Sequence, residues 1–407
     1  MSSQLDRLRR LQGLRQQKNR GTPDLPDPSF GDENARGPNL TLEDATPGAE
    51  IENHAGCCYV VTQRYGLSET HGPRPLGALL KQTPAALAAL HPKFGIDKQR
   101  DFLSAAFIDT ETTGLGAGAG VYAFMVGVGT FEATSRRSGD KDLAGTSVGK
   151  AELSQTDNPN IPNFAGDIPD LEFVVRQFFM RSPAEEGALL VALSELLAPF
   201  DMTVTFNGRT FDLPLLRTRF QQNHWLFPAG MDEVALLAPD RAHLDLLHPA
   251  RRLWRKRLRS CRLINLEARV LGLRRSEDDV PGALIPQLYV DYTRDGNASQ
   301  MARVFYHNRE DIVSMVSLAD ALSEAFGLQP SAAAPAALPG VDWLALALSL
   351  ERSGALAEAE SAYRHAATTT RQAAARGEAY EGLGRLLKRQ TRWDEAAAVW
   401  QEWLTST

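Results

Sequence analysis

The sequence predicts an α/β protein in which a mixed β-sheet with flanking helices is followed by a small all-α region. Three observations support this fold class. Short β-prone apolar runs recur within residues 51–328 and alternate there with stretches of helical period. Acidic residues stand at the ends of several of these runs. Residues 341–407 are rich in alanine and carry a helical pattern.

Length and composition set the broad class. The 407 residues leave room for two or three domains. The net charge of −6 argues against a generally cationic nucleic-acid coat. Three cysteines without zinc-ligand spacing indicate a reducing interior. We find no signal core and no run of about 18 apolar residues, so we expect a cytoplasmic protein that makes no membrane contact.

Composition also suggests domain boundaries. The expected parts are a basic, disordered tail and linker (1–50), an extension packed on the main domain (51–100), the α/β domain (101–328), a second linker (329–340) and helical repeats (341–407). Leucines among arginines at residues 4–20 have the spacing of an amphipathic helix, although we favour a solvated basic tail. Structure is expected to begin near Cys57 with a β-prone run, and a helical stretch follows around Pro75–Leu90.

The stretch Ala105–Leu115 is the centre of the α/β domain. Apolar residues lead directly into Asp109 and Glu111, as in a buried strand that ends in acids. Side chains alternate along a strand, so both carboxylates point to one face. Buried carboxylates repel each other and lose hydration, which a divalent cation between them would offset. The alternative is an ordinary strand end with solvated acids, because this spacing is short and common.

Further strands follow this motif. The glycines at 114–120 precede a strand, Val121–Phe131, and therefore predict a flexible hairpin turn rather than a dinucleotide-binding loop. Residues 134–168 are polar and predict a long hairpin insertion. Leu171–Met180 is strand-like again and is followed by helix-start signals.

A second acidic position follows the strand Met202–Phe206. Asn207 and Asp212 stand between this strand and the helix that comes next. An acid is favoured at a helix N-terminus by the helix dipole, which gives Asp212 a plain capping role. Its place beyond a second buried strand also suits a ligand that faces Asp109. Asp245 lies in a further short strand, either supporting the site or buried with its own hydrogen-bond partners.

The charge pattern then changes sign. Residues 251–262 contain seven cations in twelve positions. In an acidic protein such a cluster is a candidate phosphate-binding surface, although a solvated helix face is the plain alternative. We interpret Trp254 as a packing residue rather than a stacking surface for a base. The substrate-binding candidates in this segment are Arg251, Arg252, Arg255 and Arg262.

Helices complete the chain. A long helix over residues 299–325 carries His307 and Asp311, which share one face because they are four residues apart. They form either a structural pair or a base beside a metal-bound carboxylate. In the tail, residues 356–363 align with 393–400 in a pattern similar to tetratricopeptide repeats. Two such units seldom stand alone, so we expect them to dock on the main domain or on a protein partner.

Several of these motifs occur together in a known family. The chain resembles the DEDD 3′–5′ exonuclease superfamily and, more closely, the bacterial YprB-type ribonuclease H-like proteins with C-terminal tetratricopeptide repeats. The resemblance rests on the motifs around Asp109, Tyr122, Asn207–Asp212, His243, Arg251, Val280 and His307–Asp311. It implies a ribonuclease H-like sheet and a two-metal-dependent 3′–5′ exonuclease-like hydrolase of nucleic-acid phosphodiester bonds. The implied substrate is a single-stranded 3′ end of DNA or RNA.

The resemblance also implies roles for single residues. Asp109, Glu111, Asp212 and Asp311 are the implied ligands of two Mg²⁺ or Mn²⁺ ions about 4 Å apart. His307 is the preferred water-orienting base and Tyr306 the alternative, because only His307 has the four-residue spacing from Asp311. The remaining candidates for substrate contact are Thr112, Asn207, Tyr306 and Asn308. Two other functions stay open: a weakly active or inactive nucleic-acid-binding module, and an adaptor that recruits a protein through the repeats.

Overall fold

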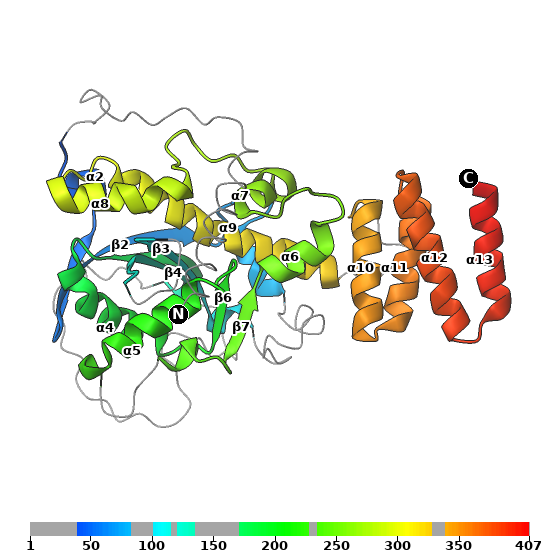
Figure 1. Cartoon of the computed structure of the whole chain (residues 1–407), viewed down its shortest axis with the longest axis horizontal. Helices are drawn as coiled ribbons and strands as arrows, with labels where there is room; N and C mark the ends of the chain where they lie inside the picture. Colours follow the sequence, from blue (N-terminus) through cyan, green and yellow to red (C-terminus); the bar gives the residue numbers. More distant parts are fainter. Residues whose placement is uncertain are drawn as a thin grey trace, which may run out of the picture. The chain divides into compact units, whose positions relative to one another are not determined.

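A mixed sheet of seven strands organises the part of the chain that precedes the helical tail (Figure 1). The computed structural model describes residues 39–82, 101–114, 120–134, 171–227, 234–327 and 338–406. Within these ranges the strand order is β1-β2-β5-β4-β3-β6-β7. The strands are β1 (Ala49–Asn53), β2 (Gly56–Gly66), β3 (Ala105–Thr112), β4 (Ala123–Ala133), β5 (Leu171–Phe179), β6 (Met202–Thr205) and β7 (Ala242–Asp245).

Strand β3 lies where the sheet changes from antiparallel to parallel pairing. It pairs antiparallel with β4 on one side and parallel with β6 on the other. β6 in turn pairs parallel with β7, whereas β4, β5, β2 and β1 are antiparallel neighbours. The carboxyl ends of β3 and β6 therefore lie at the same edge of the sheet. The arrangement agrees with the predicted α/β class and with a ribonuclease H-like sheet.

Helices cover both faces of this sheet. Ile108 and Val126 pack with α4 (Glu186–Leu197) and α5 (Asp212–Gln222) on one face. On the other face, Phe107 packs with the C-terminal half of α9 (Met301–Gly327). The other helices before the tail are α2 (Leu42–Ala45), α6 (Leu247–Trp254), α7 (Leu263–Leu266) and α8 (Ile285–Asp295). Short 3₁₀ or π turns are η3 (Leu76–Lys81), η5 (Phe102–Ser104), η6 (Pro183–Glu185), η7 (His224–Leu226), η8 (Ala235–Leu237), η9 (Glu267–Leu271) and η10 (Gly282–Leu284).

Glycines on β4 allow α9 to approach the sheet closely. A Cβ atom at Gly127 would collide with Asn308 and Ile312 of α9, and one at Gly129 would stand 2.6 Å from Ile312 Cγ2. Contacts this short do not occur between ordinary side chains, so glycine is required at both positions. The close approach brings Asn308 to the end of β3, where the acidic motif lies.

Regular structure begins before the expected N-terminal boundary at residue 50. Helix α2 lies inside the expected linker, and strand β1 begins there and pairs with β2 from Ala49 onward. β1 is largely exposed, so it lacks the apolar run that marked the other strands. Within the expected 51–100 extension, β2 pairs directly with β5 and is part of the sheet. The basic tail expected at 4–20, most of the glycine turn and the 135–168 part of the insertion lie outside the described residues.

The tail is all-α, as its composition predicts. It contains α10 (Gly340–Ser353), α11 (Leu356–Thr369), α12 (Ala373–Arg389) and α13 (Trp393–Ser406). Each helix packs against the next, and α10 also packs against α6. The two aligned segments of the sequence begin α11 and α13. In the described parts of the chain, we find no helix with the length and apolar character needed to span a bilayer.

Candidate active site at the carboxyl edge of the sheet

Four acidic side chains gather at the carboxyl end of β3. Asp109 and Glu111 come from β3, Asp212 from the first turn of α5 and Asp311 from α9. Burial, and then the charges of Asp311 and Asp212, raise the pKa of both Asp109 and Glu111 well above its usual range. Burial also raises the pKa of Asp212, to about 6, and that of Asp311. The cluster therefore carries negative charge that its own surroundings compensate incompletely.

Protein groups already donate hydrogen bonds to three of these acids. Glu111 is the exception and accepts none from the residues that the structure describes. Asn308 Nδ2 donates to Asp109 Oδ2 at 2.9 Å. Asp212 Oδ1 accepts from the backbone N–H of Thr110 at 3.1 Å and from the Thr110 hydroxyl. Arg275 donates to Asp311 Oδ1. Hydrogen bonds to a carboxylate favour its charged form, so each donor partly offsets the cost of burial.

The donor set suits a hard divalent cation, because all four side chains offer carboxylate oxygens. The side chains do not form a ready-made cage, however. Across the described ranges, no three Asp, Glu, His or Cys side chains converge closely enough to hold a metal ion as they stand. The four acids thus offer the oxygen donors and the negative charge that suit a divalent cation, while Asp311 is engaged by Arg275.

Arg275 centres a buried network beside Asp311. Its Nε donates to Glu267 Oε2 at 2.8 Å, and Nη2 bonds both Glu267 and Asp311. Glu267 and Arg275 have only 2% and 7% of their side chains exposed. Burial acts to lower the pKa of Arg275, but the hydrogen bond and charge of Glu267 and the charge of Asp311 raise it overall. No sequence pattern marks this arginine, because it lies in a loop and the two acids that it hydrogen-bonds stand 8 and 36 residues away along the chain. A third acid, Asp279, has its Oδ2 3.6 Å from Arg275 Nη1.

His307, rather than Tyr306, lies beside the acids. His307 Nε2 stands 3.9 Å from Asp311 Oδ2, and its Nδ1 is 2.7 Å from Asp279 Oδ1. The Tyr306 hydroxyl instead accepts a hydrogen bond from the backbone N–H of Ser276 at 3.1 Å. The four-residue spacing explains the difference, since it keeps His307 on the same helix face as Asp311.

Asn308 supports Asp109 from inside the protein. Its side chain is completely buried, and its Oδ1 accepts a hydrogen bond from Gln177 Nε2 at 2.9 Å while Nδ2 donates to Asp109. The expectation that Asn308 contacts substrate is therefore corrected, because its amide is used by protein groups. Gln177 was missed by sequence reasoning, since it is one polar residue within an otherwise apolar strand.

Asp245 shapes the loop that leads to Asp212. It is fully buried and accepts backbone hydrogen bonds from Asn207 (2.8 Å), Arg209 (3.2 Å) and Leu247 (3.1 Å). Of the two roles left open, it thus fits the buried acid with its own partners. Asn207 adopts a left-handed φ of 69°, which asparagine tolerates better than most residues. At the end of β3, the Thr112 hydroxyl donates to a carbonyl oxygen two residues on, at 2.7 Å.

A groove of about 730 Å³ opens next to Asn207. We call it the arginine groove, because the side chains of Arg251, Arg255, Arg259 and Arg262 line it together with Asn207. These four guanidinium groups form no ion pair with any residue in the described ranges, in contrast to Lys256 and Arg257. A row of uncompensated cations in a groove is a site for anions.

Two members of the basic segment lie elsewhere. Arg252, expected at the substrate, does not line the arginine groove; burial and the nearby charge of Arg352 in α10 lower its pKa. Trp254 is 2% exposed and packs in the core, as expected of a structural residue. Arg252 and Trp254 lie outside the groove that Arg251 and Arg255 line, because they occupy other positions around the helix. The number of cations in the sequence does not predict this difference.

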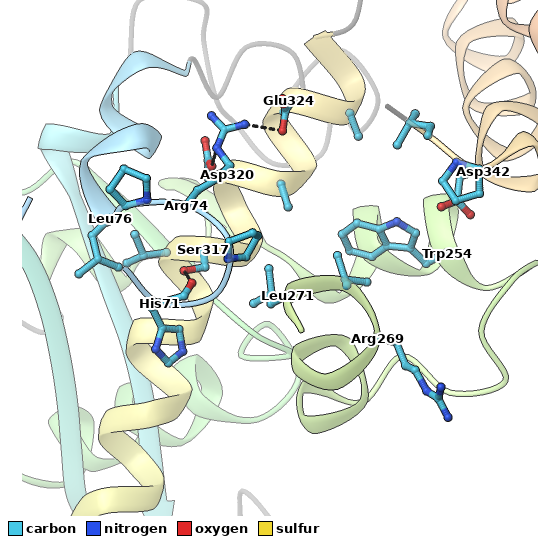
Figure 2. Close-up of a pocket in the computed structure, with 18 of the residues that line it drawn as sticks. His71, Arg74, Leu76, Trp254, Arg269, Leu271, Ser317, Asp320, Glu324 and Asp342 are labelled. Carbon is cyan, nitrogen blue, oxygen red and sulfur yellow. Dashed lines mark hydrogen bonds and ion pairs between the residues drawn. The ribbon is translucent and has the colours of Figure 1, made fainter. Parts of the chain in front are cut away.

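A smaller cavity of about 320 Å³ lies between α9, α6 and the start of α10 (Figure 2). Its wall contains Trp254 and Leu271, and most of its charged groups are paired with each other. The pairs are Arg74 with Asp320 (2.8 Å) and Glu324, and Arg257 with Asp342 (2.9 Å). None of the four acids of the cluster lines this cavity. We therefore place the candidate active site at the acidic cluster.

Known proteins are similar to parts of this chain. Residues 166–323 match a family model described as RNase_H superfamily. A protein of Bacillus subtilis (strain 168) named "Uncharacterized protein YprB" is 29% identical over 267 residues. The match covers 64% of this chain and 52% of that protein, so the chain spans about half the length of its relative. Both similarities support a ribonuclease H-like domain, and the family match includes Asp212 and Asp311.

Proposed function

We propose that this chain is a divalent-cation-dependent nuclease that hydrolyses phosphodiester bonds in nucleic acid, with the 3′–5′ exonuclease-like action of DEDD enzymes. The observation that carries the proposal is the gathering of Asp109, Glu111, Asp212 and Asp311 from separate elements at one edge of a ribonuclease H-like sheet. Burying four acids together destabilises a fold, which favours a functional reason for their presence.

Asp109, Glu111 and Asp212 would hold a Mg²⁺ or Mn²⁺ ion, with Asp311 beside them. A bound ion of this kind polarises the phosphate and makes water a better nucleophile. Asn308 and the Thr110 hydroxyl orient the carboxylates of Asp109 and Asp212 through the hydrogen bonds described above. The pair of ions that the family resemblance implies requires Asp311 to part from Arg275.

His307 takes the proton of the attacking water in this proposal. Its Nδ1 lies against Asp279, which fixes the ring and leaves Nε2 on the side of Asp311. An imidazole held in this way, with one nitrogen fixed and the other facing the acids, is suited to general-base work. Tyr306 is not in a position to share the role, because its hydroxyl is turned to the loop at Ser276.

The arginine groove would hold the phosphates of the bound strand. The four arginines line the groove together with Asn207, which follows β6, and β6 ends at the same edge of the sheet as β3 with its acids. Contacts to phosphates are independent of base sequence and strengthen binding at low salt. Thr112 and Asn207 remain proposed contacts to the terminal nucleotide.

The test compares Asp109→Asn with the wild-type chain on a 3′-labelled single-stranded oligonucleotide. Mg²⁺- or Mn²⁺-dependent digestion should fall at least about a hundredfold, because a ligand of the cation is lost. Glu195→Gln, an exposed acid of α4, is the matched control and should digest like wild type. Equal digestion by Asp109→Asn would contradict the proposal.

The hydrogen bond and ion pair between Arg275 and Asp311 favour a second candidate, a ribonuclease H-like module that binds nucleic acid without cutting it. Purified wild-type chain would then bind a single strand yet leave it intact with Mg²⁺ or Mn²⁺.

We further propose that residues 341–407 are a tetratricopeptide-like unit. An adaptor role for this unit predicts that its removal abolishes a protein complex.

A further inference from the structure

Arg275 is anchored by its surroundings. Gly272 ends η9 with a left-handed φ of 67°, and Leu273 N donates back to Glu267 O at 2.9 Å. The chain therefore turns back over the helix that it has just left, and Arg275 comes to lie over Glu267. The guanidinium meets this carboxylate through two nitrogens, the fork geometry that arginine forms best.

Glu267 keeps Arg275 in place. It is 2% exposed, and Arg275 is the only side chain in the described part of the protein that pairs with it. If Arg275 swung away, Glu267 would remain as a buried charge without a partner, which is strongly unfavourable. Arg275 is thus a fixed cation, in contrast to an exposed arginine that exchanges partners freely.

We propose that Arg275 is the resident cation of the acidic cluster and takes the place of a second divalent ion at Asp311. The chain then holds one divalent ion, at Asp109, Glu111 and Asp212. The inference rests on the proposed function for that ion. Its basis is geometric: Arg275 occupies Asp311 Oδ1, and its other terminal nitrogen stands 3.3 Å from His307 Nδ1. A dication bound at the same carboxylate would face the guanidinium at close range and be repelled.

The test counts Mn²⁺ ions on the full chain by titration, with the free-ion signal read by electron paramagnetic resonance. We expect the wild-type chain to bind one ion. The informative variant is Glu267→Gln with Arg275→Met, because the double change removes both charges of the buried pair and so does not leave Glu267 as a buried charge without its partner. Released from Arg275, Asp311 should support a second ion, bound at least tenfold more tightly than any second ion of wild type.

Two further variants make the result specific. Arg275→Lys keeps a cation at Asp311 and should still bind one ion. Asp109→Asn should lose the wild-type ion, which places that ion at the acidic cluster. Thermal unfolding of each variant without Mn²⁺ checks that it is folded.

The outcomes separate the two proposals. If the wild-type chain binds two Mn²⁺ ions with the same affinities as the double variant, the proposed role of Arg275 is wrong and the nuclease proposal still stands. If the folded double variant binds only one Mn²⁺ ion, with unchanged affinity, then Arg275 does not exclude a second ion and is only a structural partner of Glu267. No Mn²⁺ on wild type at millimolar concentration would overturn the proposed function, and the assignment of Arg275 with it.

Discussion

Glu111 has the least compensated charge of the acidic cluster. Burial and the charges of Asp311 and Asp212 raise its pKa, Arg275 lowers it, and no described group donates a hydrogen bond to it. A carboxyl group with a raised pKa in the folded state binds more protons folded than unfolded. Its contribution therefore destabilises the fold increasingly as pH rises above its unfolded pKa. Selection for stability alone would remove such an acid, whereas binding of a cation explains its presence.

Replacing Glu111 by Gln should stabilise the chain in the absence of divalent ions. We expect the free energy of unfolding near pH 8 to rise by about 0.5–2 kcal/mol, since the repelled charge is removed. The gain should shrink as pH falls toward about 5, because protonated Glu111 resembles glutamine. Denaturant unfolding in a chelator at several pH values measures both effects. A gain in unfolding free energy that does not depend on pH, or a loss of unfolding free energy near pH 8, would contradict the view that Glu111 is a repelled charge. The control Glu195→Gln should change the free energy of unfolding little.

The neighbours on α9 give a second prediction at this scale. His307→Gln should lower kcat for oligonucleotide digestion by roughly 10²–10⁴, the usual contribution of general-base catalysis. Tyr306→Phe should stay close to wild type, because the Tyr306 hydroxyl only accepts a bond from Ser276 N. Single-turnover digestion with saturating Mn²⁺ separates kcat from binding. The reverse order of the two variants would assign the base to Tyr306.

Single residues also show where sequence reasoning stops. The strand motif predicted that Asp109 and Glu111 share a face, because alternation depends only on neighbours along the chain. The groups that hold the acids come from other segments: Asn308 and Arg275 approach through α9 and the loop after η9. Local pattern contains no information on such partners. Asn308 was accordingly expected at the substrate, although it is buried behind Asp109.

At the scale of elements, buried strands were predictable and the edge strand was not. Val121–Phe131 was expected where β4 runs from Ala123 to Ala133, since a strand buried on both faces is apolar throughout. β1 is exposed at the sheet edge and reads as polar linker. The basic segment was also only partly predictable. Its seven cations are evident from the sequence, but which of them line the groove and which contact α10 depends on packing.

The arginine groove makes a prediction about salt dependence. Arg251→Gln with Arg255→Gln should weaken binding of a single strand and reduce the slope of log affinity against log salt by roughly 0.7 for each phosphate that is no longer neutralised. Lys256→Gln is the matched control, because it removes a cation of the same segment that pairs with Glu378 outside the groove. Fluorescence anisotropy in a chelator measures binding without digestion. An equal weakening in Lys256→Gln would show that only net charge matters.

At the scale of the whole molecule, one basic segment serves two surfaces. Arg251 and Arg255 line the arginine groove, while Arg257 pairs with Asp342 at the start of α10. Asp342 is completely buried; burial raises its pKa and the hydrogen bond from Arg257 lowers it. The sequence predicted that the tail would dock on the main domain or on a partner, and these contacts join it to the main domain. The joining pair lies 85 residues apart in sequence, beyond the reach of local patterns.

Removing Arg257 therefore tests how the tail is held. Arg257→Met leaves Asp342 buried without a partner, and we expect a decrease of about 3–5 kcal/mol in the free energy of unfolding. Arg257→Met with Asp342→Leu should recover most of it, since no charge then remains buried. Lys256→Met breaks only the exposed pair with Glu378 and should cost less than about 1 kcal/mol. If Arg257→Met costs no more than Lys256→Met, the tail rests on α6 through apolar contacts alone. The ion pair between Arg257 and Asp342 would then determine where α10 docks but contribute little to the free energy of unfolding.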